Sequence, residues 1–229
     1  MSEVLRIHEA YQKRKLAFSE QRWSHLNPDA LYMYQSRERK ILEIIRQRGL
    51  LPLDSKKILD IGSSKGETLY DFTRYGVQAK NCYGLDLRAE PIRLARRAHP
   101  EMHFICQNAE KLHYKSGFFD LVLCFTVFSS IRDVSMKQNI IREMLRVLKP
   151  GGYILLYDFF IKNPANLDVQ PVKPKELKLF FKGHELFFKK VTLAPPLVRM
   201  FAPLSYILCM ILEKITILRT HYLCLVRKI

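Results

Sequence analysis

One short stretch of the chain, residues 58–69, constrains the fold more than any other. It reads as an apolar strand that ends at Asp60, a turn of small residues, and the beginning of a helix. Gly62 and Gly66 allow the backbone to turn sharply and approach a ligand closely, and the N–H groups that open the helix can donate hydrogen bonds to it. This arrangement predicts a nucleotide-sized pocket at the end of the strand.

A second acidic residue, Asp86, ends another apolar stretch, residues 82–85. An acidic side chain at this distance beyond a glycine-containing turn commonly accepts hydrogen bonds from ribose hydroxyls. A dinucleotide fingerprint would need glycines at the first, third and sixth positions counted from Gly62, but the last two positions hold Ser64 and Glu67. The pattern therefore disfavours a nicotinamide dehydrogenase.

From residue 57 the hydrophobic pattern alternates between strands and helices. In chain order it predicts strands at 57–61, 82–86, 102–106, 119–124, 152–158, 186–193 and 222–226, and helices at 66–75, 90–98, 135–148 and near 174–181. Such alternation implies an α/β fold, in which helices cover both faces of a parallel sheet. Residues 1–50 read as two helices that are broken at residues 27–29.

Residues 60–66 resemble the first motif of the class I S-adenosylmethionine (SAM)-dependent methyltransferases, which reads D/E-x-G-x-G-x-G. Ser64 stands here at the middle glycine. Residues 119–124 resemble the fourth strand of that family, and residues 147–155 resemble its fifth strand with the preceding turn. The similarity is to the small-molecule group that includes the ubiquinone and menaquinone C-methyltransferases. It implies a Rossmann-like, mostly parallel seven-stranded sheet with an antiparallel last strand, and SAM as the cofactor.

The resemblance also implies a set of cofactor residues at the carboxyl ends of the strands, where open parallel sheets bind ligands. Asp86 would accept the ribose hydroxyls and Leu87 would lie against adenine. Asn108 stands where the family commonly has an Asp for the adenine amino group, and its carbonyl can accept the same bond. The full set is Asp60, Gly62, Ser63, Ser64, Gly66, Asp86, Leu87, Asn108, Ala109 and Phe125.

The methyl acceptor is expected at the same edge, beyond the fourth and fifth strands. His221, just ahead of the last strand, is a candidate base for an acceptor hydroxyl because a histidine pKa lies near neutrality. A histidine that only caps the strand is the alternative reading. Asp158 is expected to orient the base, and His184 is a second candidate base. Tyr34, Arg37 and Arg39 lie on the N-terminal helices near the expected cleft, and an exposed polar helix face explains them equally well. The histidines are scattered, so we expect no metal.

The formal net charge is +16, and residues 161–229 hold twelve Lys or Arg against four Asp or Glu. This excess points to an anionic partner, either nucleic acid, anionic lipid or a phosphorylated substrate, unless it is only a soluble basic surface. Residues 192–223 resemble the tail of small bacterial methyltransferases of surface-polysaccharide and lipid-linked sugar pathways. Residues 201–212 are too short for a membrane span. This leaves a lid over the acceptor or a helix at a membrane interface.

We therefore expect a helical cap, 1–50, and a SAM-binding methyltransferase domain, 51–229, in which 164–220 form a basic and apolar lid or acceptor-side segment. The expected acceptor is a small molecule or lipid-linked saccharide, methylated at a hydroxyl oxygen. An RNA methyltransferase that uses the basic surface is an alternative, although no added RNA-binding module is recognisable. A non-catalytic SAM-binding protein is another.

The expected location is the cytoplasm, with peripheral contact to the anionic inner membrane face. The first residues do not form the unbroken apolar run of a secretory signal, and the five cysteines form no C-x-x-C pair. The sequence does not indicate an oligomeric state.

Overall fold

The protein is described by a computed structural model that covers residues 2–17, 20–162 and 166–229. The first two positions of the expected 164–220 segment lie outside these described residues. The chain begins with α1 (Glu3–Ala17), the 3-10 helix η1 (Glu20–Trp23) and α2 (Pro28–Gln47). The expected break coincides with the start of α2, because Asn27 is extended and Pro28, which has no N–H to donate, opens the helix.

The strands and helices that follow alternate as the hydrophobic pattern predicts. The strands are β1 (Ile58–Ile61), β2 (Cys82–Asp86), β3 (His103–Cys106), β4 (Phe119–Phe125), β5 (Leu148–Phe159), β6 (Glu185–Leu193) and β7 (Arg219–Arg227). The α-helices after α2 are α3 (Glu67–Arg74), α4 (Ala89–Ala98), α5 (Val134–Val147), α6 (Pro174–Phe180), α7 (Pro195–Phe201) and α8 (Tyr206–Lys214). The shorter 3-10 helices are η2 (Ala79–Asn81), η3 (Phe128–Ser130) and η4 (Thr216–Leu218).

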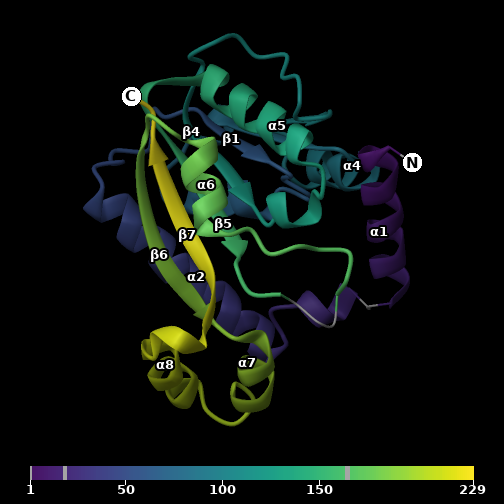
Figure 1. Ribbon diagram of the computed structural model, residues 1–229, viewed down its shortest axis with the longest axis vertical. Helices are drawn as coiled ribbons and strands as arrows, with labels where there is room; N and C mark the ends of the chain where they lie inside the picture. Colours follow the sequence, from purple (N-terminus) through teal and green to yellow (C-terminus); the bar gives the residue numbers. More distant parts are fainter. Residues whose placement is uncertain (1, 18–19, 163–165) are drawn as a thin grey trace.

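The strands form one seven-stranded sheet in the order β3-β2-β1-β4-β5-β7-β6 (Figure 1). β1 to β5 pair in parallel, whereas β7 runs antiparallel to both of its neighbours, β5 and β6. The expected mostly parallel sheet with an antiparallel last strand is thereby confirmed.

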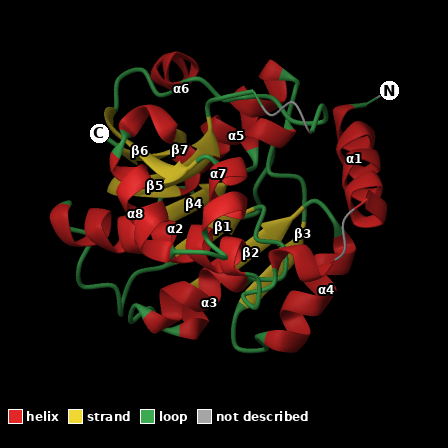
Figure 2. Cartoon of the chain, turned by 90° about the horizontal axis from the view of Figure 1, so that it is seen from below, coloured by secondary structure: helices red, strands yellow, loops and turns green. Residues whose placement is uncertain are grey.

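Helices cover both faces of the sheet (Figure 2). On one face, Ile141 and Met144 of α5 and Leu177 of α6 join a buried cluster with the strands. On the other face, Ile44 of α2 and Phe72 of α3 join a second cluster. Each helix buries one apolar stripe against the sheet, and this burial accounts for much of its stability.

β5 starts four residues earlier than the pattern predicts. Leu148 pairs with Phe119, and the next pair along the strands is Tyr153 with Leu121, so the register shifts across the turn-like residues 149–152. This irregularity accommodates Pro150, which cannot donate to the sheet, and Gly151, which has a φ of +71°.

The chain between β6 and β7 forms α7, α8 and η4 beyond the ends of these two strands, at the bottom of Figure 1. Val198 and Cys209 from this segment pack with Tyr32 of α2 and Leu193 of β6 in a third, smaller apolar cluster. The segment therefore lies at the carboxyl edge of the parallel strands, beside the first half of α2.

Candidate functional site

The turn that follows β1 is fastened to the end of β2. The backbone N–H groups of Gly62 and Ser63 both donate to the carbonyl oxygen of Leu85, at 2.8 Å each. The N–H of Gly66 then donates to the carbonyl of Ser63 at 2.8 Å, and α3 begins at the next residue. These bonds bring the glycine turn and the end of β2 together at the carboxyl edge, where open α/β sheets bind ligands.

Close packing and left-handed backbone angles require small residues in this turn. Gly62 has a φ of +76°, and a Cβ added there would lie 2.5 Å from Val127 Cγ2. Gly66 has a φ of +89°, and its Cβ would lie 2.7 Å from Phe104 Cζ. Ser64 has a φ of +49°, an angle that costs a residue with a Cβ about 1–2 kcal/mol. The turn thus keeps the backbone shape of a glycine-rich loop and holds strain at Ser64.

The side chain of Ser63 is a buried polar group in the same turn. The residue is 3% exposed, and its Oγ has no hydrogen-bond partner among the described residues. Burying an unpaired hydroxyl costs about 1–3 kcal/mol, so such groups are uncommon away from functional sites. The turn therefore offers a hydrogen-bonding group to a ligand.

Asp86 is buried, and its carboxylate is fully engaged within the protein. Oδ2 accepts a hydrogen bond from the backbone N–H of Ser64 at 3.1 Å. Oδ1 accepts from the backbone N–H of Arg88 at 2.9 Å. The Arg88 guanidinium then spans both oxygens, with Nε 3.0 Å from Oδ1 and NH2 3.1 Å from Oδ2. The ion pair with Arg88 was not predicted from the sequence. Arg88 donates to both carboxylate oxygens of Asp86, which were expected to accept hydrogen bonds from the ribose hydroxyls.

Helix α1 crosses this edge of the sheet and holds Arg88 in place. Near its start, Arg6 NH2 donates to the carbonyl oxygen of Ser130 at 2.5 Å, and near its end Lys15 pairs with Glu90 at 2.7 Å. Between these contacts, the Tyr11 ring lies 3.9 Å from Arg88 Cζ. The N-terminal helix is therefore connected to the residue that covers Asp86.

The other expected adenosine residues lie beside Asp86. The backbone N–H of Gln107, just after β3, donates to the carbonyl of Asp86 at 3.0 Å. Asn108 forms a local turn, in which its Oδ1 accepts from the N–H of Glu110 at 3.0 Å. Ala109 is buried, and Leu87 packs partly buried against the core. The structure thus brings the ends of β1, β2 and β3 together, with the amide of Asn108 already hydrogen-bonded.

Asp60 lies on the face of the sheet that α2 covers. Burial raises the pKa of the Asp60 carboxyl well above its usual value, and the nearby positive charge of Arg37 opposes that rise. The Arg37 guanidinium also lies 5.6 Å from the Phe125 ring and 5.5 Å from the Tyr157 ring. Tyr34, one helical turn away on α2, is hydrogen-bonded to buried Asp71 of α3. Of the three α2 residues named from sequence, Arg37 therefore faces the sheet and Tyr34 faces α3, whereas Arg39 is exposed on the outer side of the helix.

His221 lies beside these aromatic rings. Its imidazole stacks on Tyr157, with ring centroids 5.0 Å apart and planes inclined by 8°, and its Nδ1 lies 2.9 Å from Thr220 Oγ1. Burial, and secondarily the charge of Arg37, lowers the pKa of His221 to about 4. The imidazole is therefore neutral near pH 7 and able to accept a proton or a hydrogen bond.

Asp158 does not orient His221, and that prediction is wrong. In the antiparallel pairing of β5 with β7, Asp158 lies opposite Tyr222 and His221 lies opposite Phe159, so the two side chains project from opposite faces of the sheet. Asp158 instead accepts from the N–H of Ser129 at 3.0 Å. Burial raises the pKa of the Asp158 carboxyl to about 7.

His184 is also misplaced as a candidate base. It precedes β6, whose first residue, Glu185, pairs with Arg227 near the end of β7. Its Nδ1 accepts a hydrogen bond from the N–H of Ile229 at 3.3 Å. His184 therefore lies at the amino edge of the parallel strands, at the opposite end of β7 from His221.

Backbone strain is concentrated at the carboxyl edge, where it could not be predicted from the sequence. Besides Ser64, two threonines have left-handed angles, Thr126 with φ +55° after β4 and Thr192 with φ +62° near the end of β6. Thr192 Oγ1 lies 2.9 Å from the Tyr157 hydroxyl. Residues other than glycine rarely adopt these angles, and such residues cluster at ligand sites. Threonine carries no sequence signal for this conformation.

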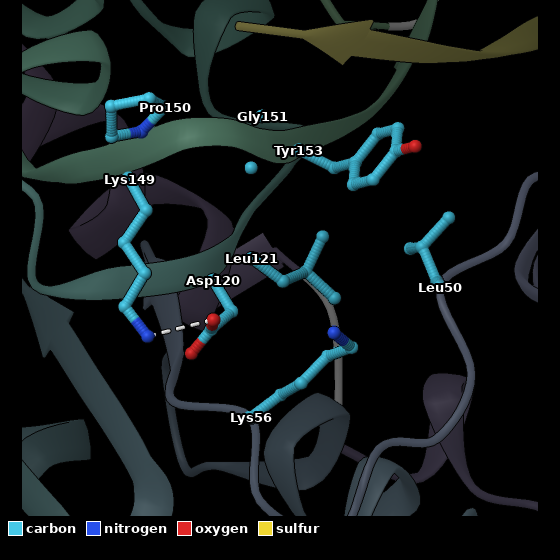
Figure 3. A pocket seen from close by; sticks show the side chains of 9 residues that line it. Leu50, Lys56, Asp120, Leu121, Lys149, Pro150, Gly151 and Tyr153 are labelled. Carbon is cyan, nitrogen blue, oxygen red and sulfur yellow. Dashed lines mark hydrogen bonds and ion pairs between the residues drawn. The ribbon is translucent and has the colours of Figure 1, made fainter.

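A small cavity of about 100 Å³ lies at the opposite, amino edge of the sheet. Figure 3 shows Leu50, Lys56 and Tyr153 around it, with Lys149 paired to Asp120 at 2.8 Å. The Asp120 carboxylate also accepts from the backbone N–H of Lys57 at 2.9 Å. These contacts join the start of β4 to the irregular start of β5, and they lie away from the glycine turn.

Within 2–17, 20–162 and 166–229, no group of three His, Cys, Asp or Glu side chains could hold a metal ion. In the same ranges, the helices are all too short or too polar to cross a membrane.

Residues 59–156 match a family model described as a methyltransferase domain. The chain is 32% identical over 154 residues to norajmaline N-methyltransferase of Rauvolfia serpentina, and the aligned region covers 63% of this chain and 50% of that protein. It is 29% identical over 110 residues to the ubiquinone/menaquinone biosynthesis C-methyltransferase of Vibrio cholerae, covering 45% and 41%. The chain thus spans half or less of the length of these curated relatives.

Solved structures share the fold at low sequence identity. A SAM-dependent methyltransferase from Methanosarcina mazei superimposes with a TM-score of 0.58 at 20% identity, over 77% of this chain and 93% of that chain. One from Archaeoglobus fulgidus gives a TM-score of 0.59 at 15% identity, over 86% and 98%. The [4+2]-cyclase SpnF gives 0.59 at 18% identity, over 82% and 80%. These likenesses establish a Rossmann-like fold of the class I methyltransferase type.

Proposed function

This chain belongs to the class I SAM-dependent methyltransferase family, and from that premise we propose that it transfers a methyl group from SAM to a small-molecule or lipid-linked saccharide acceptor. The observation that carries the proposal is the turn after β1, whose left-handed Gly62 and Gly66 and bonds to Leu85 form a cradle against the end of β2. We propose the methyl transfer itself as well as the acceptor, because this chain spans half or less of the length of its curated relatives.

The residues of the carboxyl edge fit SAM. A Cβ at Gly62 or Gly66 would collide with neighbouring side chains, so the turn is built for small residues. The buried hydroxyl of Ser63 lacks a protein partner among the described residues and is available to a ligand. The residues proposed to hold the cofactor are Asp60, Gly62, Ser63, Ser64, Gly66, Asp86, Leu87, Asn108, Ala109 and Phe125. When bound, SAM supplies an electrophilic methyl group on a sulfonium.

On the acceptor side, the protein supplies a neutral imidazole among aromatic rings. The lowered pKa of His221 keeps its imidazole uncharged at neutral pH, so a ring nitrogen can accept a hydrogen bond or a proton from an acceptor hydroxyl. The same shift makes it a weaker proton acceptor than an ordinary histidine. Thr220 and Tyr157 fix its ring, through the contact at Nδ1 and the stacking. Asp158 holds the η3 turn after β4 through the N–H of Ser129, so its proposed role is to position that turn. Holding the acceptor in line with the methyl group would supply much of the rate.

The finer assignments belong to the same proposal. Residues 1–50 act as a helical cap, 51–229 as the SAM-binding domain, and 164–220 as the acceptor-side segment. The methylated atom is a hydroxyl oxygen, whereas the named relatives act at nitrogen and carbon. The location is the cytoplasm, with peripheral contact to the anionic inner membrane face, which agrees with the excess of Lys and Arg in residues 161–229.

Two alternatives have specific support. The net charge of +16 favours an RNA substrate. A non-catalytic or non-methylating role is favoured by SpnF, which shares the fold and is named a [4+2]-cyclase.

One experiment separates these functions. The purified protein is incubated with radiolabelled SAM and fractionated cell extract, and the small-molecule, lipid, glycan, RNA and protein pools are counted separately. Label in the small-molecule, lipid or glycan pool, lost in the His221→Ala variant but with SAM affinity retained, is the expected result. Isotope-labelled methyl groups and NMR of the product then distinguish a methyl ether from an N-methyl or C-methyl group. Label in RNA, or SAM binding with no label in any pool, would reject the proposal.

A further inference from the structure

Helix α8 turns its apolar side chains toward solvent. Ile207, Met210 and Ile211 are 70%, 49% and 54% exposed. Together with exposed Lys214 they occupy positions i, i+3, i+4 and i+7, so they lie along one side of the helix. We call these four residues the α8 stripe. A surface helix of a soluble protein normally buries such a stripe.

The opposite side of α8 is fixed to the protein by a buried acid. Glu213 is 8% exposed, and its carboxylate accepts hydrogen bonds from the Tyr32 hydroxyl at 2.7 Å and from Ser36 Oγ at 2.5 Å. Cys209, one turn earlier, is fully buried in the cluster with Val198. Turning the α8 stripe inward would break these bonds and expose this cluster. The outward direction of the stripe is therefore built into the packing.

Neighbouring residues in the chain extend the apolar surface. Leu204 precedes α8 and is 79% exposed, and Ile217 follows it in η4 and is 80% exposed. Ile215, between the two helices, is also exposed. Large exposed apolar surfaces in soluble proteins mark sites of interaction with another protein, a ligand or a membrane.

The segment beside this surface has an excess of basic residues. Residues 195–220 contain Arg199, Lys214 and Arg219 and a single acidic residue, Glu213, whose carboxylate is buried. Arg199 is ion-paired with Asp29 of α2 at 3.8 Å, and Arg219 donates to backbone carbonyl oxygens, so Lys214 is the cation that this surface presents to solvent. Lys214 ends the α8 stripe, where its aliphatic stem can lie along apolar surface while its ammonium reaches outward. An apolar stripe with basic residues beside it is the pattern of a helix that lies in a membrane interface.

We propose that the α8 stripe, together with Leu204, Ile215 and Ile217, binds the surface of an anionic lipid bilayer. At nine residues, α8 is too short to span a bilayer and would lie in its interface. The inference rests on the proposed function, for which it names the membrane-binding surface.

The position of α8 relates this surface to the acceptor residues. Ser36, which holds Glu213, precedes Arg37 on α2, and Arg37 lies against Tyr157. A bilayer bound at the α8 stripe would therefore lie on the same side of the molecule as the proposed acceptor site. That placement suits an acceptor carried on a lipid.

Flotation of the full chain with vesicles tests the inference. The vesicles contain phosphatidylcholine alone or phosphatidylcholine with phosphatidylglycerol. We expect binding to the mixed vesicles that Ile207→Ser/Ile211→Ser weakens roughly tenfold or more, and that Lys214→Gln weakens about fivefold. Leu179→Ser on α6, where Leu179 is 76% exposed, is the matched control and should bind as the unaltered chain does.

The outcomes separate this inference from the proposed enzyme function. SAM affinity is measured on every variant, because it reports folding and the cofactor site independently of lipid. Equal binding of both vesicle types, or equal binding by the double variant, would overturn the inference. So would a dimer in sedimentation that the double variant converts to a monomer, since a second copy would then cover the face. Vesicle binding without methyl transfer in any pool would instead retain the surface and reject the enzyme.

Discussion

Arg88 covers the carboxylate of Asp86 with a two-point contact, from Nε to Oδ1 at 3.0 Å and from NH2 to Oδ2 at 3.1 Å. The Tyr11 ring of α1 lies over the guanidinium at 3.9 Å. If a ribose diol is to use both oxygens, this guanidinium has to move aside. The ion pair then competes with the cofactor for one acidic side chain.

Removing the Arg88 side chain should therefore strengthen SAM binding. An ion pair that is partly exposed is worth up to about 1 kcal/mol, so we expect Arg88→Ser to lower the dissociation constant for SAM by about fivefold. Isothermal titration calorimetry measures this directly. Arg93→Ser removes the same charge from the exposed side of α4 and should leave the affinity unchanged. Weaker binding by Arg88→Ser alone would mean that Arg88 helps to hold the cofactor.

Removing the Asp86 carboxylate should have the opposite effect. Asp86→Ala takes away the proposed acceptor of the ribose hydroxyls, and we expect SAM affinity to fall about 30-fold or more, because a hydrogen bond to a charged group contributes about 1.5–3 kcal/mol. Calorimetry with the folded variant, checked by circular dichroism, provides the measurement.

Asp120 offers a matched control for this substitution. Like Asp86, it accepts from a backbone N–H, that of Lys57, and from a basic side chain, that of Lys149. It lies at the amino edge of the sheet, so Asp120→Ala should lower stability without changing SAM affinity. A similar loss of affinity in both variants would point to general loosening of the sheet and count against the ribose contact.

His221 should make stability depend on pH in mildly acidic solution. Its folded-state pKa of about 4 lies below the usual histidine value of 6.5, so the unfolded chain binds the proton more tightly. Its contribution is fully present above pH 6.5 and is lost as the pH falls toward 4, by about 3 kcal/mol in total. Urea unfolding across this range should show a shallower pH dependence in His221→Gln than in the unaltered chain.

Asp158 changes stability with pH in the opposite direction to His221, over an overlapping range of pH. Its folded-state pKa is raised to about 7 from 3.8, so its contribution to stability is present below pH 3.8 and is lost as the pH rises toward 7. For that reason the prediction concerns the difference between the unaltered chain and His221→Gln, in which the Asp158 contribution cancels. Parallel curves for the two proteins would refute the lowered pKa of His221.

The strain at Ser64 predicts a stabilising substitution. Ser64 has a φ of +49°, and Ser64→Gly removes the Cβ that makes this angle unfavourable. Part of the gain is offset by the greater freedom of glycine in the unfolded chain, so we expect a net gain of up to about 1 kcal/mol in unfolding free energy. Ser64→Ala keeps the Cβ and should show no such gain. Denaturant midpoints compare the three proteins.

Local patterns predicted the glycine turn, because strand, turn and helix are adjacent in the chain. The same adjacency placed Asp86 at the end of β2, and the mostly parallel seven-stranded sheet with an antiparallel β7 was confirmed. The relation between Asp158 and His221 could not be predicted in this way. It depends on the register of β5 against β7, and a shift of one residue would move a side chain to the other face.

Side-chain contacts could not be predicted from the sequence either, whether the two residues are close together or far apart in the chain. Whether Arg88 turns toward Asp86 or toward solvent depends on Tyr11, which is far away in sequence. The apolar composition of α8 suggested a lid or an interfacial helix, but the composition alone cannot say which side is fixed inward. That orientation follows from the buried bonds of Glu213 to Tyr32 and Ser36.

The connection between β6 and β7 leaves the sheet and returns to it at one edge, carrying α7, α8 and η4 with it. The glycine turn follows β1, which lies three positions from β7 and four from β6 in the strand order. An exchange of this connection for one of different length would change the surface beside α2, while the turn after β1 would keep its bonds to β2. Insertions between β6 and β7 can therefore vary without changing the pairing of the parallel strands.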